Sequence, residues 1–282
     1  MVFTCTESSF QNAHQVKIYT REYIPSESVS TVFLFLHGVG EHCSRFHDFF
    51  SYLANNFIAV FAMDHQGHGK SGGARFDIKR FDTFVADVNQ FSDLIRARFQ
   101  SQDLKYVVCG FSFGGLVAAL VGSQIPRRWD GVLLVAPAVG VEQHGIRKVQ
   151  ESFAPIIKVL LPKVRAVPLG KLEDLSRDPH YLKDYEEDPL VNHHKLRVRL
   201  GVEMLRGMKQ LRKQESNMTA PLLILHGERD VITSPRLSRK FFDRVPSANK
   251  TYKSLPGQVH AILNEPERDT SIASIVEWTR SI

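Results

Sequence analysis

Short, wholly apolar runs that alternate with helical patterns constrain the fold of this chain more than any other feature. Such runs, rich in β-branched and aromatic residues, are typical of strands buried on both faces of a parallel sheet. They occupy residues 31–36, 57–63, 106–109, 131–135 and 221–225. Weaker alternation predicts a last strand at residues 250–255 and an antiparallel edge strand at residues 16–23.

Helical patterns lie between these runs. Residues 81–99 carry apolar side chains every three to four positions, as an amphipathic helix does, and shorter helices are predicted at 116–125 and 272–278. Strands that alternate with helices predict an α/β fold built on a mostly parallel central sheet flanked by helices.

The alternation stops between residues 139 and 214. That stretch has no strand-like run, and helical pieces are predicted at 152–161 and 196–211. We therefore predict a core formed by residues 1–138 and 215–282, with a helical cap (or lid) at 139–214 inserted between two strands. The predicted cap carries 15 Lys and Arg against 10 Asp and Glu, so it holds nearly all of the net charge of +6.

A serine follows the predicted strand at 106–109 in the sequence GFSFG, residues 110–114. A G-x-S-x-G motif with a strand before it and an apolar helix after it is typical of a nucleophile elbow, in which a sharp turn presents the serine hydroxyl. We therefore predict Ser112 as the nucleophile. The N–H of Phe113, at the start of the following helix, is predicted to stabilise an oxyanion.

A nucleophilic serine needs a base, and the base needs an orienting carboxylate. On this type of sheet the chain order is serine, acid, histidine. Asp230 follows the predicted strand at 221–225, and His260 follows the last predicted strand, so both lie where active sites form. Glu228 is a competing carboxylate.

A second oxyanion donor is expected in the loop after an early strand. The sequence His37-Gly38-Val39-Gly40 follows the run at 31–36. We predict that the Val39 N–H is this donor, and we assign His37 a structural role.

Several motifs partly match the patterns of nucleotide-binding, metal-binding or disulfide-bonded proteins, but each match is incomplete. Residues 67–72 (GHGKSG) fit G-x-G-x-x-G, but no apolar helix opens directly after them, and a Walker motif would need glycine where Asp64 stands. The 12 histidines show no HExxH spacing, and the three cysteines (Cys5, Cys43, Cys109) are too few for a zinc or disulfide framework. We predict no cofactor and no metal. We also predict no nucleic-acid partner, because the basic residues of the predicted cap lack interleaved surface aromatics.

Residues 106–126 form an uncharged stretch of the length of a membrane span. Its glycines and serines instead favour a strand, a turn and a helix. The first ten residues lack the pattern of a secretory signal, which predicts a cytoplasmic protein. The basic predicted cap and its apolar stretch at 153–161 suggest peripheral contact with an anionic membrane.

Taken in order, these motifs make the chain resemble the monoacylglycerol lipase and lysophospholipase group of α/β-hydrolases. The resemblance rests on HGVGEH at 37–42, DHQGHGKS at 64–71, the elbow at 110–115, DPLV at 188–191, HGERD at 226–230 and the His260 loop. It implies the α/β-hydrolase fold and a cap over an acyl-binding tunnel. The group's cap cysteines have no counterpart in this insert.

The predicted reaction is hydrolysis of a single-chain lipid ester through an acyl-enzyme, carried out by Ser112, Asp230 and His260 without a cofactor. A general carboxylesterase, a thioesterase and a serine peptidase share this machinery and remain alternatives, as does a non-enzymatic ligand receptor. The sequence gives no indication of the oligomeric state, the chain-length preference or the regiochemistry.

Overall fold

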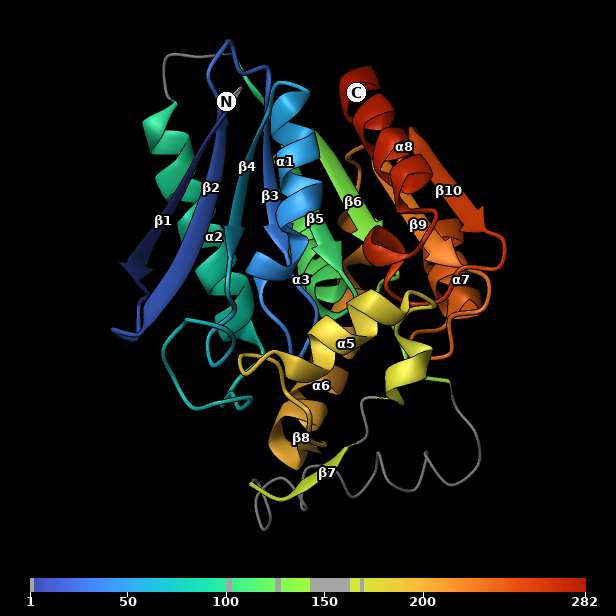
Figure 1. Ribbon diagram of the computed structural model, residues 1–282. Coiled ribbons are helices and arrows are strands. Elements are labelled where there is room, and N and C mark those ends of the chain that lie inside the picture. The colour runs from blue at the N-terminus through green and yellow to red at the C-terminus, as the bar shows by residue number, and fades with distance from the viewer. Residues whose placement is uncertain (1–2, 100–102, 125–127, 143–162, 168–169) are drawn as a thin grey trace.

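A central sheet of eight strands organises the molecule. The computed structural model describes residues 3–99, 103–124, 128–142, 163–167 and 170–282. The strands lie in the order β1-β2-β4-β3-β5-β6-β9-β10 (Figure 1). They are β1 (Phe3–Gln11), β2 (Lys17–Pro25), β3 (Thr31–Leu36), β4 (Ile58–Met63), β5 (Lys105–Phe111), β6 (Gly131–Val135), β9 (Leu222–Gly227) and β10 (Lys250–Leu255). The strands from β4 to β10 are parallel, whereas β1 and β2 run antiparallel to their neighbours.

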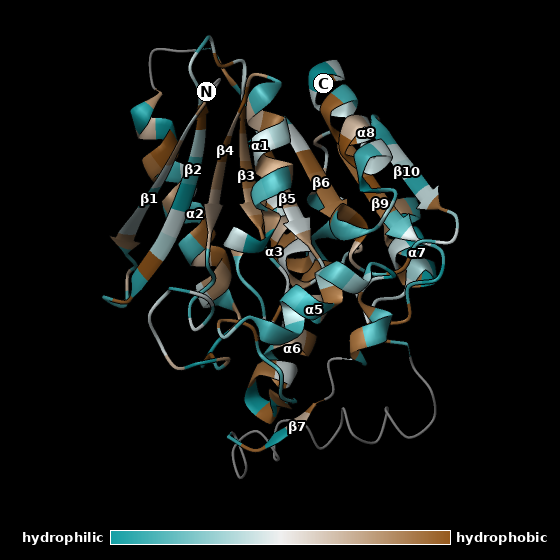
Figure 2. Ribbon diagram, viewed as in Figure 1, coloured by the Kyte–Doolittle hydropathy of each residue, from teal (hydrophilic) through white to brown (hydrophobic). Residues whose placement is uncertain are grey.

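Apolar residues on both faces of the inner strands explain why this sheet is sandwiched between helices. Along β3, Leu34 and Phe35 face opposite sides, and both are at most 1% exposed. One face packs against α1 (His47–Asn55) and α8 (Arg268–Ser281), and the other against α2 (Asp82–Arg98), α3 (Phe113–Gln124) and α7 (Pro235–Arg244). Figure 2 shows the inner strands as the most hydrophobic part of the sheet, with paler strands at its edges.

The predicted α/β sheet is confirmed, and each run predicted as a strand overlaps one, with ends that differ by no more than two residues. The outermost strand differs from the prediction. We expected residues 16–23 at the edge, but β1 lies outside β2 and pairs with it along its whole length. Most β1 side chains are exposed, so this strand leaves no apolar pattern in the sequence.

The chain between β6 and β9, which we call the β6–β9 segment, leaves the sheet and returns to the neighbouring position, because β6 pairs with β9. It contains α5 (Pro179–Glu187) and α6 (Val198–Gln214) at the carboxyl ends of the strands (Figure 1). The expectation that it has no strand is wrong, since β7 (Arg165–Val167) pairs with β8 (Leu196–Arg197). These strands are too short to show a periodic pattern. The helix predicted at 152–161 lies outside the described residues.

The uncharged stretch that begins at Tyr106 forms β5, a turn and α3, as predicted. Of the helices that the structure describes, none is long and apolar enough to cross a membrane.

Candidate active site

Ser112 occupies a tight turn between β5 and α3. Its backbone adopts a left-handed φ of 54°, a conformation that is uncommon for residues with a side chain and is typical of functional turns. The Ser112 N–H donates to the Val135 carbonyl (2.9 Å), and the Ser112 carbonyl accepts from the Ala138 N–H (3.0 Å). These bonds tie the turn to the end of β6 and hold the strained backbone in place.

Glycines let the backbone segments of the turn approach each other. A Cβ added at Gly110 would lie 2.1 Å from the Gly114 carbonyl oxygen, and one added at Gly114 would lie 2.1 Å from the Leu36 carbonyl oxygen. Both neighbours are main-chain atoms that cannot swing aside. The elbow therefore requires glycine at both positions, and it lies directly against the loop that follows β3.

The loop after β3 contains the second predicted oxyanion donor. Leu36 pairs with Gly110 in the sheet, so Val39 and Phe113 both follow paired strand ends. Within the described residues, no hydrogen bond from the N–H of Val39 or of Phe113 is recorded. Both donors are therefore available to a developing oxyanion, which is the requirement for such a site.

The His37 side chain bonds to the main chain of this loop and of the loop after β4. Its Nδ1 donates to the Gly38 carbonyl (2.7 Å), and its Nε2 accepts the His65 N–H (2.9 Å). His37 is fully buried, and burial together with the nearby His65 and His68 lowers its pKa well below the usual range. A neutral imidazole with both nitrogens engaged in backbone contacts fits the structural role that we assigned to it.

Asp230 lies in the loop after β9 and accepts five hydrogen bonds. Its Oδ1 accepts the N–H groups of Ile232 (2.8 Å) and Thr233 (3.0 Å). Its Oδ2 accepts from His260 Nδ1 (2.8 Å), His226 Nε2 (3.1 Å) and Thr233 Oγ1 (2.8 Å). Burial raises the pKa of Asp230, but the charge of His260 and the hydrogen bonds from both histidines outweigh it and hold that pKa far below the usual range.

The competing carboxylate lies elsewhere. Glu228 is exposed and accepts a hydrogen bond from Ser254 Oγ (2.9 Å). It has no contact with His260 among the recorded hydrogen bonds of the described residues, so the geometry favours Asp230 as the orienting carboxylate.

His260 is 2% exposed, and its ring packs on that of Phe111 with centroids 4.9 Å apart. Phe111 immediately precedes Ser112, so the imidazole lies beside the elbow. Because an ionised carboxylate only accepts, His260 Nδ1 carries the proton that it shares with Asp230, and Nε2 is left as an acceptor. No hydrogen bond joins the Ser112 hydroxyl to His260 in the described part of the chain, and such contacts commonly tighten only when substrate binds.

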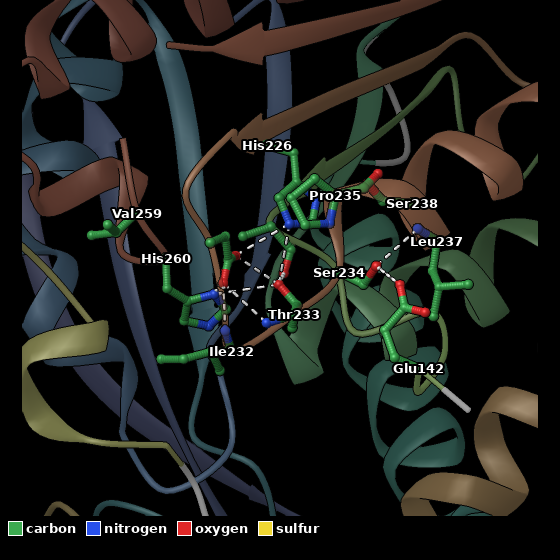
Figure 3. Close-up of polar contacts among 12 residues, drawn as sticks. Glu142, His226, Ile232, Thr233, Ser234, Pro235, Leu237, Ser238, Val259 and His260 are labelled. Carbon is green, nitrogen blue, oxygen red and sulfur yellow. Dashed lines mark hydrogen bonds and ion pairs between the residues drawn. The ribbon is translucent and has the colours of Figure 1, made fainter. Parts of the chain in front are cut away.

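Two residues of this network were not predicted. In Figure 3 the side chains of His226 and Thr233 lie close to that of His260, and all three bond to Oδ2 of Asp230. His226 Nδ1 in turn lies 2.7 Å from Ser238 Oγ, and because the ionised Asp230 only accepts, His226 Nε2 is the nitrogen that donates to it. His226 is part of a motif quoted above, but nothing in the sequence assigned it a role. Thr233 left no signal at all.

A polar cluster links the loop after β3 to α5. Asp188 Oδ2 accepts from His42 Nε2 (2.8 Å) and from Arg45 (3.2 Å), and the Arg45 guanidinium stacks on Tyr181 and Tyr185. The predicted oxyanion loop is therefore braced by the β6–β9 segment.

The side chain of Asp64 packs against the glycine-rich loop at 67–72 and bonds to its main chain. Asp64 accepts the N–H groups of Cys43 (2.8 Å) and Lys70 (2.7 Å), and it approaches Gly69 closely. This arrangement leaves no cradle for a phosphate. Over the residues that the structure describes, no group of three or more His, Cys, Asp or Glu side chains is arranged to hold a metal ion.

The chain is similar to known proteins along most of its length. A family model described as "Serine aminopeptidase, S33" matches residues 27–267. The monoacylglycerol lipase of Mycolicibacterium smegmatis is 30% identical over 98% of this chain and 97% of its own length. Human monoglyceride lipase is 28% identical over 93% of this chain and 86% of its own.

A solved structure shows the same fold. A soluble variant of the Saccharomyces cerevisiae monoglyceride lipase, in complex with a substrate analogue, superposes with a TM-score of 0.85 at 22% identity. The superposition covers 100% of this chain and 95% of the yeast chain. Similarity to these relatives extends over nearly the whole chain, the β6–β9 segment included.

Proposed function

This chain belongs to the serine aminopeptidase, S33, family of α/β-hydrolases, and from that premise we propose that it hydrolyses the esters of single-chain lipids, monoacylglycerols first among them. One observation carries the proposal. The Asp230–His260 pair, joined at 2.8 Å, lies beside a serine in a strained elbow that adjoins two free N–H donors. Relatives named for this activity support the substrate class.

In the proposed reaction, His260 Nε2 takes the proton of the Ser112 hydroxyl as its oxygen attacks the ester carbonyl carbon. Asp230 keeps the imidazole oriented and stabilises its cation. The N–H groups of Val39 and Phe113 hold the oxyanion of the tetrahedral intermediate. His260 then gives its proton to the leaving alcohol, and water releases the fatty acid from Ser112 by the same steps.

We further propose that residues 139–214 act as a cap over the acyl group. In support, α6 packs Met204 and Met208 against the buried cluster that contains α3. The cap also touches the predicted oxyanion loop, because the Asn192 N–H donates to the Gly40 carbonyl (2.7 Å).

Part of the positive charge of the cap is neutralised by acidic side chains of the core. Arg197 and Arg199 pair with Asp77, and Arg177 pairs with Glu265. Strands β7 and β8 lie at the end of the cap farthest from the sheet (Figure 1). Exposed cations remain within or next to these strands in the sequence, namely Lys163, Arg165 and Lys195, as does Val164 at 45% exposure. We propose that this end contacts an anionic membrane surface.

A hydrolysis panel tests the substrate class. We expect monoacylglycerols to be cleaved faster than lysophospholipids, acyl-CoA thioesters, short p-nitrophenyl esters and aminoacyl amides. Ser112→Ala should abolish all of these activities while the protein stays folded by circular dichroism. Full activity of that variant on a p-nitrophenyl ester, or faster cleavage of aminoacyl amides by the unmodified protein, would contradict the proposal.

Vesicle co-sedimentation tests the membrane contact. Binding should increase with the fraction of anionic lipid and decrease for Lys163→Glu combined with Lys195→Glu. Lys105→Glu is a matched control, since Lys105 is also exposed but lies at the start of β5, at the opposite end of that strand from the elbow. Binding that depends on neither lipid charge nor the cap lysines would overturn this part.

A further inference from the structure

The loop that carries His260 is attached to the rest of the molecule on two sides. On the side of the acid loop, the Arg229 N–H donates to the Gln258 carbonyl (3.0 Å). Gly227 packs so closely there that an added Cβ would lie 2.4 Å from the Val259 carbonyl oxygen. These contacts come from the end of β9, the same strand that presents Asp230.

On the other side the loop is attached to the cap. The Ala261 N–H, next in the chain after His260, donates to the Leu175 carbonyl (2.7 Å). Leu175 lies between a short 3₁₀ turn (Leu172–Asp174) and α5. The main chain beside the predicted catalytic histidine is therefore bonded to a segment that is about 85 residues away in the sequence.

A single buried carboxylate links this cap segment to the other neighbour of His260. Glu265 is completely buried. Its Oε1 accepts from the Ser176 hydroxyl and from the Arg177 N–H, both at 2.7 Å. Its Oε2 accepts from Arg177 Nε (2.7 Å) and, over a longer contact of 3.4 Å, from the Val259 N–H. Every lone-pair direction of the carboxylate thus has a donor, as a buried charge requires.

The two attachments on the cap side depend on the same group. Glu265 contacts Val259 directly, and it places Leu175 by binding the next two residues, Ser176 and Arg177. Asp230 orients the imidazole ring but does not hold the main chain on either side of it. Catalysis needs the base within a few tenths of an ångström of its productive position.

We propose that Glu265 and Arg177 form a positioning pair, through which the docked cap segment 175–177 holds His260 in line with Ser112. Neither side chain takes part in the chemistry. Their effect is on the fraction of time for which His260 Nε2 lies where it can accept the Ser112 proton. The inference rests on the proposed function only through the roles of Ser112 and His260, and it holds for any ester substrate.

Glu265→Gln tests the pair, because it keeps the size of the side chain and one acceptor while it removes the charge and the second carboxylate oxygen. We expect kcat for a short p-nitrophenyl ester to fall about 10-fold, with KM within a factor of two. The rate at which a fluorophosphonate labels Ser112 should fall by the same factor, and this readout needs no lipid substrate.

Glu215→Gln is the matched control. Glu215 is also a buried carboxylate, and it accepts hydrogen bonds from Arg244 Nε (2.5 Å) and Arg244 Nη2 (3.0 Å). Among the described residues it has no hydrogen bond with the His260 loop. Its substitution should lower the melting temperature as much as Glu265→Gln does and leave kcat and the labelling rate unchanged.

Arg177→Ala keeps the result interpretable if Glu265→Gln folds poorly, because Arg177 is about one-third exposed and its loss leaves the Glu265 carboxylate bound to Ser176. It should lower the labelling rate about 3-fold, and the double variant should lose no more than Glu265→Gln alone. Labelling rates within a factor of two of the unmodified protein for both single variants would overturn the inference, as would an equal loss in Glu215→Gln. Equal labelling of Ser112→Ala and the unmodified protein would instead refute the proposed function, and the inference with it.

Discussion

The elbow that carries Ser112 and the β6–β9 segment, which we propose as a cap, are held in place by partly different kinds of contact. Around the elbow, main-chain atoms pack at distances that tolerate no Cβ, and the surrounding side chains are apolar. The β6–β9 segment also packs apolar side chains of α6 on the core, but it is fastened there in addition by polar and charged side chains, with Asp77 binding Arg197 and Arg199, and Asp188 binding His42 and Arg45.

This difference separates the contacts that control turnover at Ser112 from the contacts that attach the cap to the core. Backbone packing responds little to salt, whereas ion pairs that are partly exposed are weakened by it. Changes at the elbow and its partners should therefore reduce turnover, and most changes at the cap contacts should reduce stability. The Glu265–Arg177 pair is the place where we expect a cap contact to change turnover.

The largest effect is expected at the acid. Asp230→Asn should lower kcat roughly 10⁴-fold, because an amide no longer stabilises the imidazolium and favours the wrong tautomer of His260. Steady-state kinetics on a soluble ester measure this loss. Glu228→Gln is the matched control, and a greater loss in that variant would reverse the assignment of the acid.

Gly114→Ala should lower kcat about 100-fold or more, since its Cβ would meet the Leu36 carbonyl oxygen and force the oxyanion loop away from the elbow. Gly122→Ala provides a comparison in the same helix, because its Cβ would meet side chains rather than main chain, the nearest being Val132 at 2.7 Å. It should cost stability without slowing turnover. A folded Gly114→Ala protein with unchanged kcat would refute the proposed geometry of the elbow.

The cap contact at Asp77 should behave in the opposite way. Asp77 is 3% exposed and accepts from Arg197 (3.1 Å) and from Arg199 Nε (2.8 Å). Asp77→Asn should lower the free energy of unfolding by roughly 2–3 kcal/mol and leave kcat for a short ester unchanged. Urea titrations at low and at 1 M salt measure it, with a smaller difference expected at high salt. A large loss of kcat without a loss of stability would show that this cap contact controls turnover rather than attachment of the cap.

The last effect tests a buried acid in the core itself. Burial raises the pKa of Asp87 to about 7, although a hydrogen bond from Asn12 lowers it. Because the folded protein holds this proton more tightly than the unfolded chain, its stabilisation is complete below about pH 4 and is lost as the pH rises through 7.

Asp87→Asn removes that pH dependence, so its stability relative to the unmodified protein should increase between about pH 4 and 7 and level off above. Thermal melts across this range measure the trend. The exposed Asp93, on the same helix, supplies the control Asp93→Asn, which should show no such increase. Parallel curves for Asp87→Asn and the unmodified protein would contradict the buried, protonated state of Asp87.

Much of the fold follows from the sequence because the inner strands are buried on both faces. That burial leaves uninterrupted apolar runs such as residues 31–36, and the elbow leaves a motif with fixed neighbours. The order of Ser112, Asp230 and His260 followed from the same logic. Strand β1 escaped prediction because its exposed side chains carry no apolar pattern.

The supporting residues of the site could not be predicted from local patterns. Thr233 and Glu265 act through contacts that exist only after distant segments meet, and His226 is one of 12 histidines. The charge of the cap was also informative only in part. The sequence shows an excess of basic residues, but only the structure shows that Arg197 and Arg199 are bound to an acid of the core.

In the proposed mechanism, Ser112 carries the acyl group during turnover. Rapid quenching of the protein with a monoacylglycerol, followed by peptide mass spectrometry, measures this directly. We expect a fatty-acyl mass on the peptide that contains Ser112 and, where release of the fatty acid is the slower step, a burst of glycerol equal to the enzyme concentration, both absent in Ser112→Ala. An adduct on another residue, or release of glycerol by Ser112→Ala at the rate of the unmodified protein, would contradict it.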